Sequence, residues 1–261
     1  MSDETERPGA AAWVPEYDDR EQGAAPGGGA APEGGAAPEG GAAPEGGAAP
    51  AGDAAPASAP ASVAALRAAA PACRGCELQQ HATQVVFSAG AQTATLMLVG
   101  EQPGDREDLE GRPFVGPAGR LLADAVTKAG IDRGALYVTN AVKHFRFEER
   151  GPRRIHKTPA VGHVVACHPW LEAEVDAIAP QVILCLGATA ARSVLGRTAS
   201  VTRERGQLLQ APDVAARLGR DVKVLLTTHP SAVLRLRGEP TFDDAFAALV
   251  ADLRLAASHL R

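Results

Sequence analysis

Four nearly continuous apolar runs, each five or six residues long, constrain the fold of this chain more than any other feature. They end at Val99, Thr139, Leu186 and Thr227, and each is followed by loop residues and then by a segment with helical spacing. Runs that are apolar at nearly every position are typical of strands buried on both faces of a parallel sheet. The alternation predicts an α/β fold, a three-layer α/β/α sandwich around a mainly parallel central sheet.

The remaining elements follow the same order along the chain. Strands are predicted at 95–99, 135–139, 182–186 and 222–227, with a shorter candidate at 84–87. Helices are predicted at 63–70, 121–129, 188–195 and 242–257, and within 158–179. Roughly 200 residues with this pattern are enough for one well-buried core.

The first 61 residues have a different composition from the rest. They consist mainly of Gly, Ala, Pro and Glu, with the unit Ala-Ala-Pro-Glu-Gly-Gly repeated at 30–35, 36–41 and 42–47. Such a segment has little apolar surface to bury against its ordering entropy, so we expect a disordered acidic tail at 1–61 and one folded domain at 62–261. The tail carries a net charge of −9 and the domain +4, so the overall charge of −5 conceals a mildly basic domain.

The sequence has no basic start followed by an apolar run, and no window approaches the roughly 20 apolar residues of a membrane span. We therefore expect a soluble, cytoplasmic protein without a membrane partner. The four cysteines are Cys73, Cys76, Cys167 and Cys185. In a reducing compartment they indicate metal or cluster ligands, or buried thiols, ahead of disulfides.

The segment 151–159 concentrates the positive charge of the domain around one histidine. Six of the fifteen positions at 143–157 are Lys or Arg, and they surround His156. Pro152 and Pro159 stiffen the two ends, which predicts a presented loop rather than a helix or a strand. A stiff basic loop with one titratable nucleophile suits a polyanionic substrate, and the alternative is a charged surface loop with an incidental histidine.

Several polar motifs follow the ends of the predicted strands. Residues 100–105 follow the first long strand, Asn140 follows the second and the triplet 229–231 follows the fourth. Each motif has a structural explanation of its own, as a tight turn, a cap or a loop. Because the carboxyl ends of parallel strands meet at one edge of the sheet, where ligands bind in such folds, their convergence predicts a site there.

The motifs themselves resemble those of a known family. The segments at 100–105 (GEQPGD), 111–122 (GRPFVGPAGRLL), 138–143 (VTNAVK) and 229–231 (HPS) are similar to those of family 4 uracil-DNA glycosylases. The segment RRIHKTP at 153–159 resembles the signature loop of the UdgX-type enzymes of that superfamily. The resemblance runs from about Ala72 to the C-terminus in one collinear order and does not include the tail.

This resemblance implies that uracil is flipped out of DNA and its glycosidic bond broken, which leaves an oxocarbenium-like C1′. Phe114 would stack on uracil, Asn140 would hydrogen-bond its Watson–Crick edge, and His229 would donate to a uracil carbonyl oxygen. Gly100 and Ser231 belong to the same set of substrate-binding residues.

The UdgX-type loop implies a second step, in which His156 attacks C1′ and joins the protein covalently to the DNA. Glu101 or Gln102 would orient the imidazole. Arg153 and Arg154 would help to keep the imidazole neutral while they grip phosphates.

Two further features concern the same step. Gln102 and Asp105 belong to the loop that would otherwise position a water molecule. UdgX-type motifs usually begin with Lys, whereas Pro152 stands in that position here. The change removes one phosphate contact and stiffens the approach to His156.

Residues 229–235 would supply the wedge that enters the gap left by the flipped base. Leu234 is the expected intercalating residue, with Arg235 and Arg237 near phosphates. The alternative is that these residues pack under the final helix. The expected partner is uracil-containing DNA, preferably single-stranded. The resemblance also implies a monomeric, bacterial-type protein that is associated with the nucleoid when on DNA.

The cysteines fit the same resemblance, which implies a 4Fe–4S cluster held by Cys73, Cys76 and Cys167. The fourth ligand falls at His144, where hydrolytic relatives have Cys. Cys185 lies within a predicted strand and is better explained as a small buried apolar residue. A zinc site made by the same ligands is the chemical alternative.

Three functions therefore remain in view. The first is a uracil-DNA glycosylase that becomes covalently trapped through His156. The second is a hydrolytic glycosylase of family 4 with repeated turnover, and the third is a non-enzymatic iron–sulfur or zinc module that binds nucleic acid.

Overall fold

The four predicted apolar runs form the centre of one sheet in the computed structural model, which describes residues 62–260. The strands β3 (Leu136–Asn140), β2 (Leu96–Gly100), β6 (Val182–Leu186) and β8 (Lys223–Thr227) lie side by side in that order, all parallel. Short antiparallel strands complete the edges, β1 (Ala89–Gly90) beside β3 and β7 (Leu208–Leu209) beside β8. The predicted mainly parallel sheet is confirmed, and the expected disordered tail lies outside the described residues.

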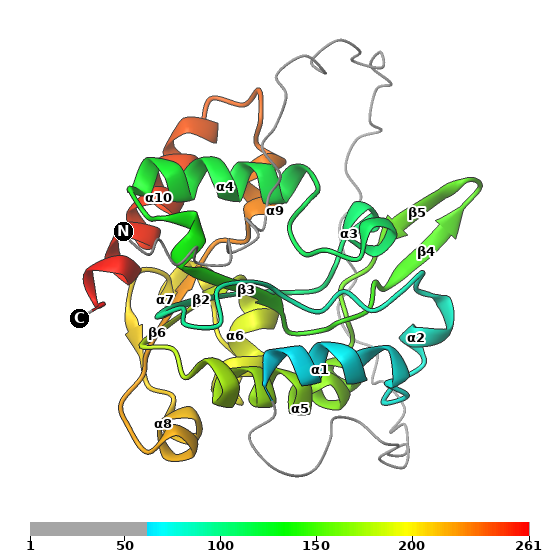
Figure 1. Cartoon of the computed structure of the whole chain (residues 1–261). Helices are drawn as coiled ribbons and strands as arrows, with labels where there is room; N and C mark the ends of the chain where they lie inside the picture. Colours follow the sequence, from blue (N-terminus) through cyan, green and yellow to red (C-terminus); the bar gives the residue numbers. More distant parts are fainter. Residues whose placement is uncertain (1–61, 261) are drawn as a thin grey trace, which may run out of the picture.

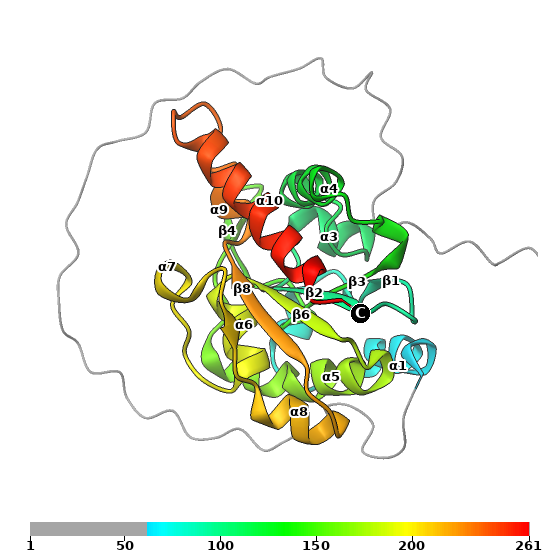
Figure 2. The same cartoon turned by 90° about the vertical axis from the view of Figure 1, so that its left-hand side faces the viewer.

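Helices cover both faces of this sheet, as Figures 1 and 2 show. Met97 and Val99 point to the face covered by α1 (Val63–Ala69), α5 (Val161–Ile178), α6 (Ala188–Leu195) and α8 (Pro212–Leu218). Leu96 and Leu98 point to the face covered by α4 (Pro117–Ala129), α9 (Pro230–Leu234) and α10 (Phe242–Ser258). Every residue of β2, β3 and β6 is buried, which explains why these strands are apolar on both faces.

The remaining elements are short and connect these layers. They are η2 (Ala70–Ala72), α2 (Leu78–His81), α3 (Asp105–Glu110), η3 (Arg133–Ala135) and α7 (Val201–Glu204). None of the helices within residues 62–260 has both the length and the apolar character that a membrane span requires.

Two of the expected boundaries change for identifiable reasons. The strand candidate at 84–87 is wrong, because this segment makes isolated contacts such as Val86 N–H to Lys143 O at 2.9 Å and no ladder. The helix expected at 121–129 begins earlier, at Pro117, whose fixed φ suits the first turn of a helix.

The basic segment is a β-hairpin, so its prediction as a loop without strand structure is wrong. The strands β4 (Phe147–Arg150) and β5 (Arg153–His156) pair antiparallel, with Phe147 opposite His156. Gly151 has a φ of 57° in the two-residue turn, and a short hairpin turn needs such a conformation in its first central residue. Pro152 takes the second central position, where its restricted φ is compatible with the turn. In Figure 1 this hairpin extends away from the sheet beside α3.

One arginine attaches this hairpin to α3. Arg154 Nε lies 2.6 Å from Asp105 Oδ1, and Arg154 Nη1 lies 2.6 Å from Asp108 Oδ2. The guanidinium also lies over the rings of Phe145 and Phe147, with its Cζ 5.6 Å and 5.1 Å from their centroids. Arg154 thus holds the hairpin in place, and its expected contact with phosphates stays a prediction.

Replacement of Asp108 by Ala tests this attachment. Asp108 is fully buried, and besides Arg154 it accepts the backbone N–H of Thr83 at 3.0 Å. Its removal leaves the Thr83 N–H without its acceptor and deprives Arg154 of its buried carboxylate partner, so we expect a loss of about 2–4 kcal/mol in the free energy of unfolding.

Denaturant unfolding measures this loss, with Glu110→Ala as the matched control on the same helix. Glu110 makes an exposed ion pair with Arg106, and its removal should cost less than about 0.5 kcal/mol. Equal losses in the two variants would contradict the proposed attachment.

Candidate active site

Three predicted site residues meet where β2 and β3 end. Gly100 lies directly opposite Asn140 in the sheet. A Cβ added to Gly100 would clash with Oδ1 of Asn140 and would lie 2.7 Å from Cζ of Phe114. Asn140 and Phe114 therefore both approach the Gly100 backbone closely. An aromatic ring beside a carboxamide can stack on a planar base and hydrogen-bond its edge, so we refer to the surroundings of these two side chains as the base-binding space.

The backbone around Phe114 is held in an unusual conformation. Phe114 has a φ of 58°, a region that residues with a side chain rarely adopt. A Cβ added to Gly119 would clash with the Phe114 carbonyl group, so the first turn of α4 packs directly against this backbone. Strained residues of this kind occur often at ligand sites, where the surrounding structure fixes them.

A buried carboxylate, Glu107, joins the two loops that form this space. Its Oε2 accepts the N–H of Gly104 at 3.1 Å, and its Oε1 accepts the N–H of Gly116 at 2.8 Å. Glu107 was not among the site residues predicted from the sequence. The signal that could have found it is an acidic residue at the third position of a helix that begins after a Pro-Gly turn.

His229 is held in one tautomer by the residues that follow it. Its Nδ1 accepts the backbone N–H of Ser231 at 3.2 Å and lies 2.8 Å from the Ser231 hydroxyl. A neutral ring that accepts at Nδ1 carries its proton on Nε2. Burial lowers the pKa of His229 to about 4, with contributions from His156 and Arg235, so the ring is neutral at pH 7. Nε2–H is thus a neutral hydrogen-bond donor.

His156 lies beside both residues that were expected to orient it. Its Nε2 is 2.9 Å from Gln102 Nε2 and 3.6 Å from Glu101 Oε1. Partial burial lowers the pKa of His156, and the positive charge of Arg235 adds to this effect against the opposing charge of Glu101. The ring is therefore kept neutral, but by burial and Arg235 rather than by the expected Arg153 and Arg154.

The orientation of the Gln102 amide determines how His156 presents its ring nitrogen. Gln102 Oε1 accepts Arg146 N–H at 3.1 Å, and Gln102 Nε2 donates to the carbonyl oxygens of Arg146 and Lys157 at 3.1 Å and 3.0 Å. These backbone contacts fix which end of the amide faces the imidazole. An amide nitrogen donates hydrogen bonds and does not accept them, so a His156 ring with its lone pair on Nε2 and its proton on Nδ1 is favoured. The two hydrogens of the amide are shared among this lone pair and the two carbonyl oxygens.

The turn between β6 and α6 contributes residues that were not predicted from the sequence. A Cβ added to Gly187, which has a φ of 93°, would lie 3.2 Å from Cβ of His229. Two residues later, Thr189 donates its hydroxyl to Glu101 Oε2 at 2.5 Å. A buried strand followed by Gly-Ala-Thr is a weak signal by itself. The contact arises from the order of the strands, because β6 lies between β2 and β8.

Three of the four cysteines lie near one another. Burial raises the pKa of Cys167 to about 12, and neighbouring Cys73 and Cys76 contribute to this shift. Cys73 Sγ accepts Trp170 Nε1–H, and Cys167 Sγ accepts the backbone N–H of Lys143, each at 3.3 Å. Hydrogen bonds to sulfur of this kind suit thiolate ligands, so these residues fit a thiolate-bound centre.

The two candidates for the fourth ligand differ in their surroundings. Cys185 lies within β6, and burial alone raises its pKa, in agreement with a buried apolar role. His144 is also buried, and burial lowers the pKa of its ring. Within residues 62–260, no group of three or more His, Cys, Asp or Glu side chains is already arranged around a metal position. The assignment of His144 stays a prediction.

Comparison with known proteins identifies a family. The sequence model of the Uracil DNA glycosylase superfamily matches residues 87–254.

The chain belongs to the uracil-DNA glycosylase superfamily.

Named relatives are similar over most of their length. The type-4 uracil-DNA glycosylase of Archaeoglobus fulgidus is 36% identical over 166 residues, which are 62% of this chain and 78% of the relative. That of Thermotoga maritima is 39% identical over 166 residues, or 63% of this chain and 79% of the relative. That of Pyrobaculum aerophilum is 35% identical over 170 residues, or 64% and 83%.

The residues expected to form the wedge are only partly accessible in this member of the superfamily. Leu234, at the end of α9, packs in part against the core formed with α4 and α10. Arg235 is exposed, and Arg237 lies over the ring of Phe242, with its Cζ 5.9 Å from the centroid. These positions suit the alternative of packing near the final helix, and intercalation by Leu234 stays a prediction.

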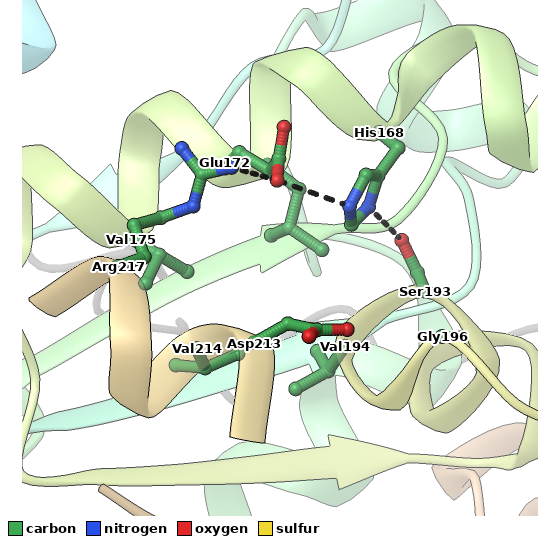
Figure 3. A pocket seen from close by; sticks show the side chains of 10 residues that line it. His168, Glu172, Val175, Ser193, Val194, Gly196, Asp213, Val214 and Arg217 are labelled. Atoms are coloured by element: carbon green, nitrogen blue, oxygen red, sulfur yellow. Dashed lines mark hydrogen bonds and ion pairs between the residues drawn. The ribbon is translucent and has the colours of Figure 1, made fainter. Parts of the chain in front are cut away.

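A second polar cluster lies among α5, α6 and α8, away from the glycosylase site (Figure 3). His168 Nδ1 lies 3.5 Å from Ser193 Oγ, and His168 Nε2 lies 3.4 Å from Glu172 Oε1. These distances are at or beyond the limit of a useful hydrogen bond, and Arg217 already pairs with Glu172. The adjoining cavity has a volume of about 50 Å³.

Replacement of Gly100 by Ala tests the base-binding space. The added methyl group would displace Asn140 or Phe114, and displacement of such groups by about 1 Å can reduce catalysis by roughly 100-fold. We expect a loss of that order in the single-turnover rate of uracil release from a uracil-containing oligonucleotide.

Gly162→Ala is the matched control. Gly162 lies in α5 with no atom within 4 Å of an added Cβ, so this variant should retain the normal rate. If Gly100→Ala released uracil at the normal rate, the proposal that the base binds beside Phe114 and Asn140 would be wrong.

Proposed function

We propose that this chain excises uracil from DNA and is then captured on the product, through a covalent bond between His156 Nε2 and C1′ of the deoxyribose. The general activity follows from membership of the superfamily: the chain is a uracil-DNA glycosylase, a DNA repair enzyme. The observation that supports the capture step is the position of His156. A hairpin holds it beside Glu101 and Gln102, at the sheet edge that also carries His229.

Base recognition uses the space above Gly100. The flipped uracil would stack on Phe114 and meet the carboxamide of Asn140, whose N–H and C=O groups complement a uracil carbonyl and N3–H. Thymine has a methyl group at C5 that uracil lacks, so a tight space beside the ring can discriminate between the two bases.

Departure of the base develops negative charge on uracil. His229 Nε2–H would donate to a uracil carbonyl oxygen as this charge grows. A neutral donor with its proton fixed on Nε2 is already oriented and needs no proton transfer before it acts. The C1′–N1 bond then breaks with its electron pair on uracil, and C1′ becomes cationic.

Capture requires a lone pair directed at this cation. The tautomer favoured by Gln102 has that lone pair on Nε2 of His156, and the lowered pKa keeps it unprotonated at neutral pH. Bond formation between Nε2 and C1′ converts imidazole into a positively charged imidazolium. Loss of its Nδ1 proton to solvent, and protonation of the uracil anion, restore neutrality on both products.

The other expected properties of the partner belong to this proposal. Extrusion of a base costs least in an unpaired strand, which supports a preference for single-stranded DNA. We propose that the protein acts as a monomer.

Denaturing electrophoresis tests the capture step. The protein is mixed with a single-stranded oligonucleotide that carries one uracil, and free uracil is measured in parallel. We expect a heat- and detergent-resistant protein–DNA band with uracil and none with thymine. The variant His156→Ala should release uracil and leave an abasic site without this band.

Lys157→Ala is the matched control, because it removes a neighbouring charge of the same hairpin and leaves the imidazole. Lys157 pairs with exposed Glu148, and its loss should preserve the band. Repeated release of uracil by the wild-type protein without any band would assign the chain to the hydrolytic class. No base loss at all, with the metal site fully loaded, would favour a binding module.

We further propose that Cys73, Cys76, Cys167 and His144 hold a 4Fe–4S cluster. Such a cluster would serve as a structural link in this chain, because these ligands join the N-terminal segment to α5 and to the segment after Asn140. Glu77, next to Cys76, already contacts this helix, with its Oε1 2.5 Å from His163 Nε2. Zinc bound by the same residues is the alternative outcome.

Metal analysis and visible absorption of the purified protein test this assignment. We expect iron and sulfide with a broad visible absorption that Cys167→Ala removes. The matched variant Cys185→Ala deletes an equally buried thiol and should retain it. His144→Cys should also retain the cluster, since it restores the usual thiolate. Zinc without iron in the wild-type protein, or loss of iron in Cys185→Ala, would contradict the proposed ligands.

A further inference from the structure

The strand order brings an unassigned residue into the active site. β6 lies between β2, which leads into Glu101, and β8, which leads to His229. The residues that follow β6 must therefore lie between these two groups. Thr189, the second residue of α6, is the polar side chain at this position.

Thr189 makes a well-defined contact there. Its hydroxyl donates to Glu101 Oε2 at 2.5 Å, a short hydrogen bond of the kind made to charged acceptors. The other oxygen, Glu101 Oε1, lies 3.6 Å from His156 Nε2. This distance is too long for a hydrogen bond but short enough for strong electrostatic attraction to a positive ring.

We propose that Thr189 is a positioning residue for covalent capture: its hydroxyl holds the Glu101 carboxylate where it stabilises the positive charge that develops on His156. This inference rests on the proposed function. As Nε2 bonds to C1′, the imidazole becomes an imidazolium and the leaving electron pair stays on uracil. A carboxylate fixed beside the ring favours this product, and it does so without occupying the lone pair that attacks.

The hydroxyl has two effects on the carboxylate. It donates a hydrogen bond to Oε2. It also leaves Oε1 3.6 Å from His156 Nε2, so Gln102, at 2.9 Å, remains the closer partner of that nitrogen. Without the hydroxyl, Glu101 could rotate away from His156 or approach it directly. In the first position the imidazolium would lose its stabilising charge. In the second the carboxylate would occupy the lone pair that must attack C1′.

The test compares Thr189→Val with Thr189→Ser in single-turnover reactions on the uracil oligonucleotide. Val has nearly the same shape as Thr and lacks the hydroxyl, whereas Ser retains it. Two products are measured, free uracil and the covalent protein–DNA band. We expect Thr189→Val to form the band about tenfold more slowly, the effect of one lost hydrogen bond to a charged group, with a smaller effect on uracil release.

The consequence is a change in the fate of the DNA. In Thr189→Val a larger share of released uracil should leave a free abasic site, and Thr189→Ser should restore the share seen with wild type. Wild-type capture by Thr189→Val would overturn the inference and leave the proposed function intact. An equal loss of uracil release and capture would also overturn it, because Thr189 would then support the whole site. Failure of the wild-type protein to form any band would instead overturn the proposed function.

A double-mutant cycle keeps the inference testable if Thr189→Val folds poorly. Glu101→Gln keeps an acceptor for the hydroxyl and removes the negative charge, so it should also slow capture. If Thr189 acts through this charge, Thr189→Ser and Thr189→Val should have little further effect in the Glu101→Gln background. An effect of Thr189→Val that is equally large in the wild-type and Glu101→Gln backgrounds would contradict the inference.

Discussion

The ion pairs of Arg154 hold together the two parts of the site. The sheet and its helices position the residues at the strand ends, but His156 belongs to a separate two-stranded hairpin. A ribbon of two strands has little stability alone, so it needs an attachment to a larger body. Arg154 provides it through Asp105 and Asp108, with two aromatic rings beneath its guanidinium. Loss of this attachment would leave the imidazole without a defined position relative to Gln102.

The strand order determines the rest of the site. The four central parallel strands end at one edge, and the loops that follow them deliver the base-binding space, the neutral donor His229 and the Glu101 carboxylate. Close backbone approach is needed at Gly100 and Gly119, where any side chain would collide with the residues expected to bind the base. Fixed backbone contacts at Gln102 and Ser231 then select the tautomer of each histidine.

Much of the fold and the membership of the site were predictable from the sequence. The central strands were found because burial on both faces makes them apolar at nearly every position. The hairpin was missed because its strands are exposed and charged, so they lack this pattern, and because Pro152 and Pro159 were interpreted as the stiff ends of a loop. The partners of Arg154 and the contact of Thr189 depend on residues distant in the chain, and motif spacing carries no information about such contacts.

The placement of His156 on the hairpin has an evolutionary consequence. Under the proposed function, the sheet edge performs excision, whereas the hairpin determines what happens to the reactive sugar afterwards. The hairpin contributes no strand to the six-stranded sheet. Substitutions that spare Arg154 can therefore change the fate of the sugar without altering the strands of the sheet, and one scaffold can diverge between a recyclable enzyme and a protein consumed by its own reaction.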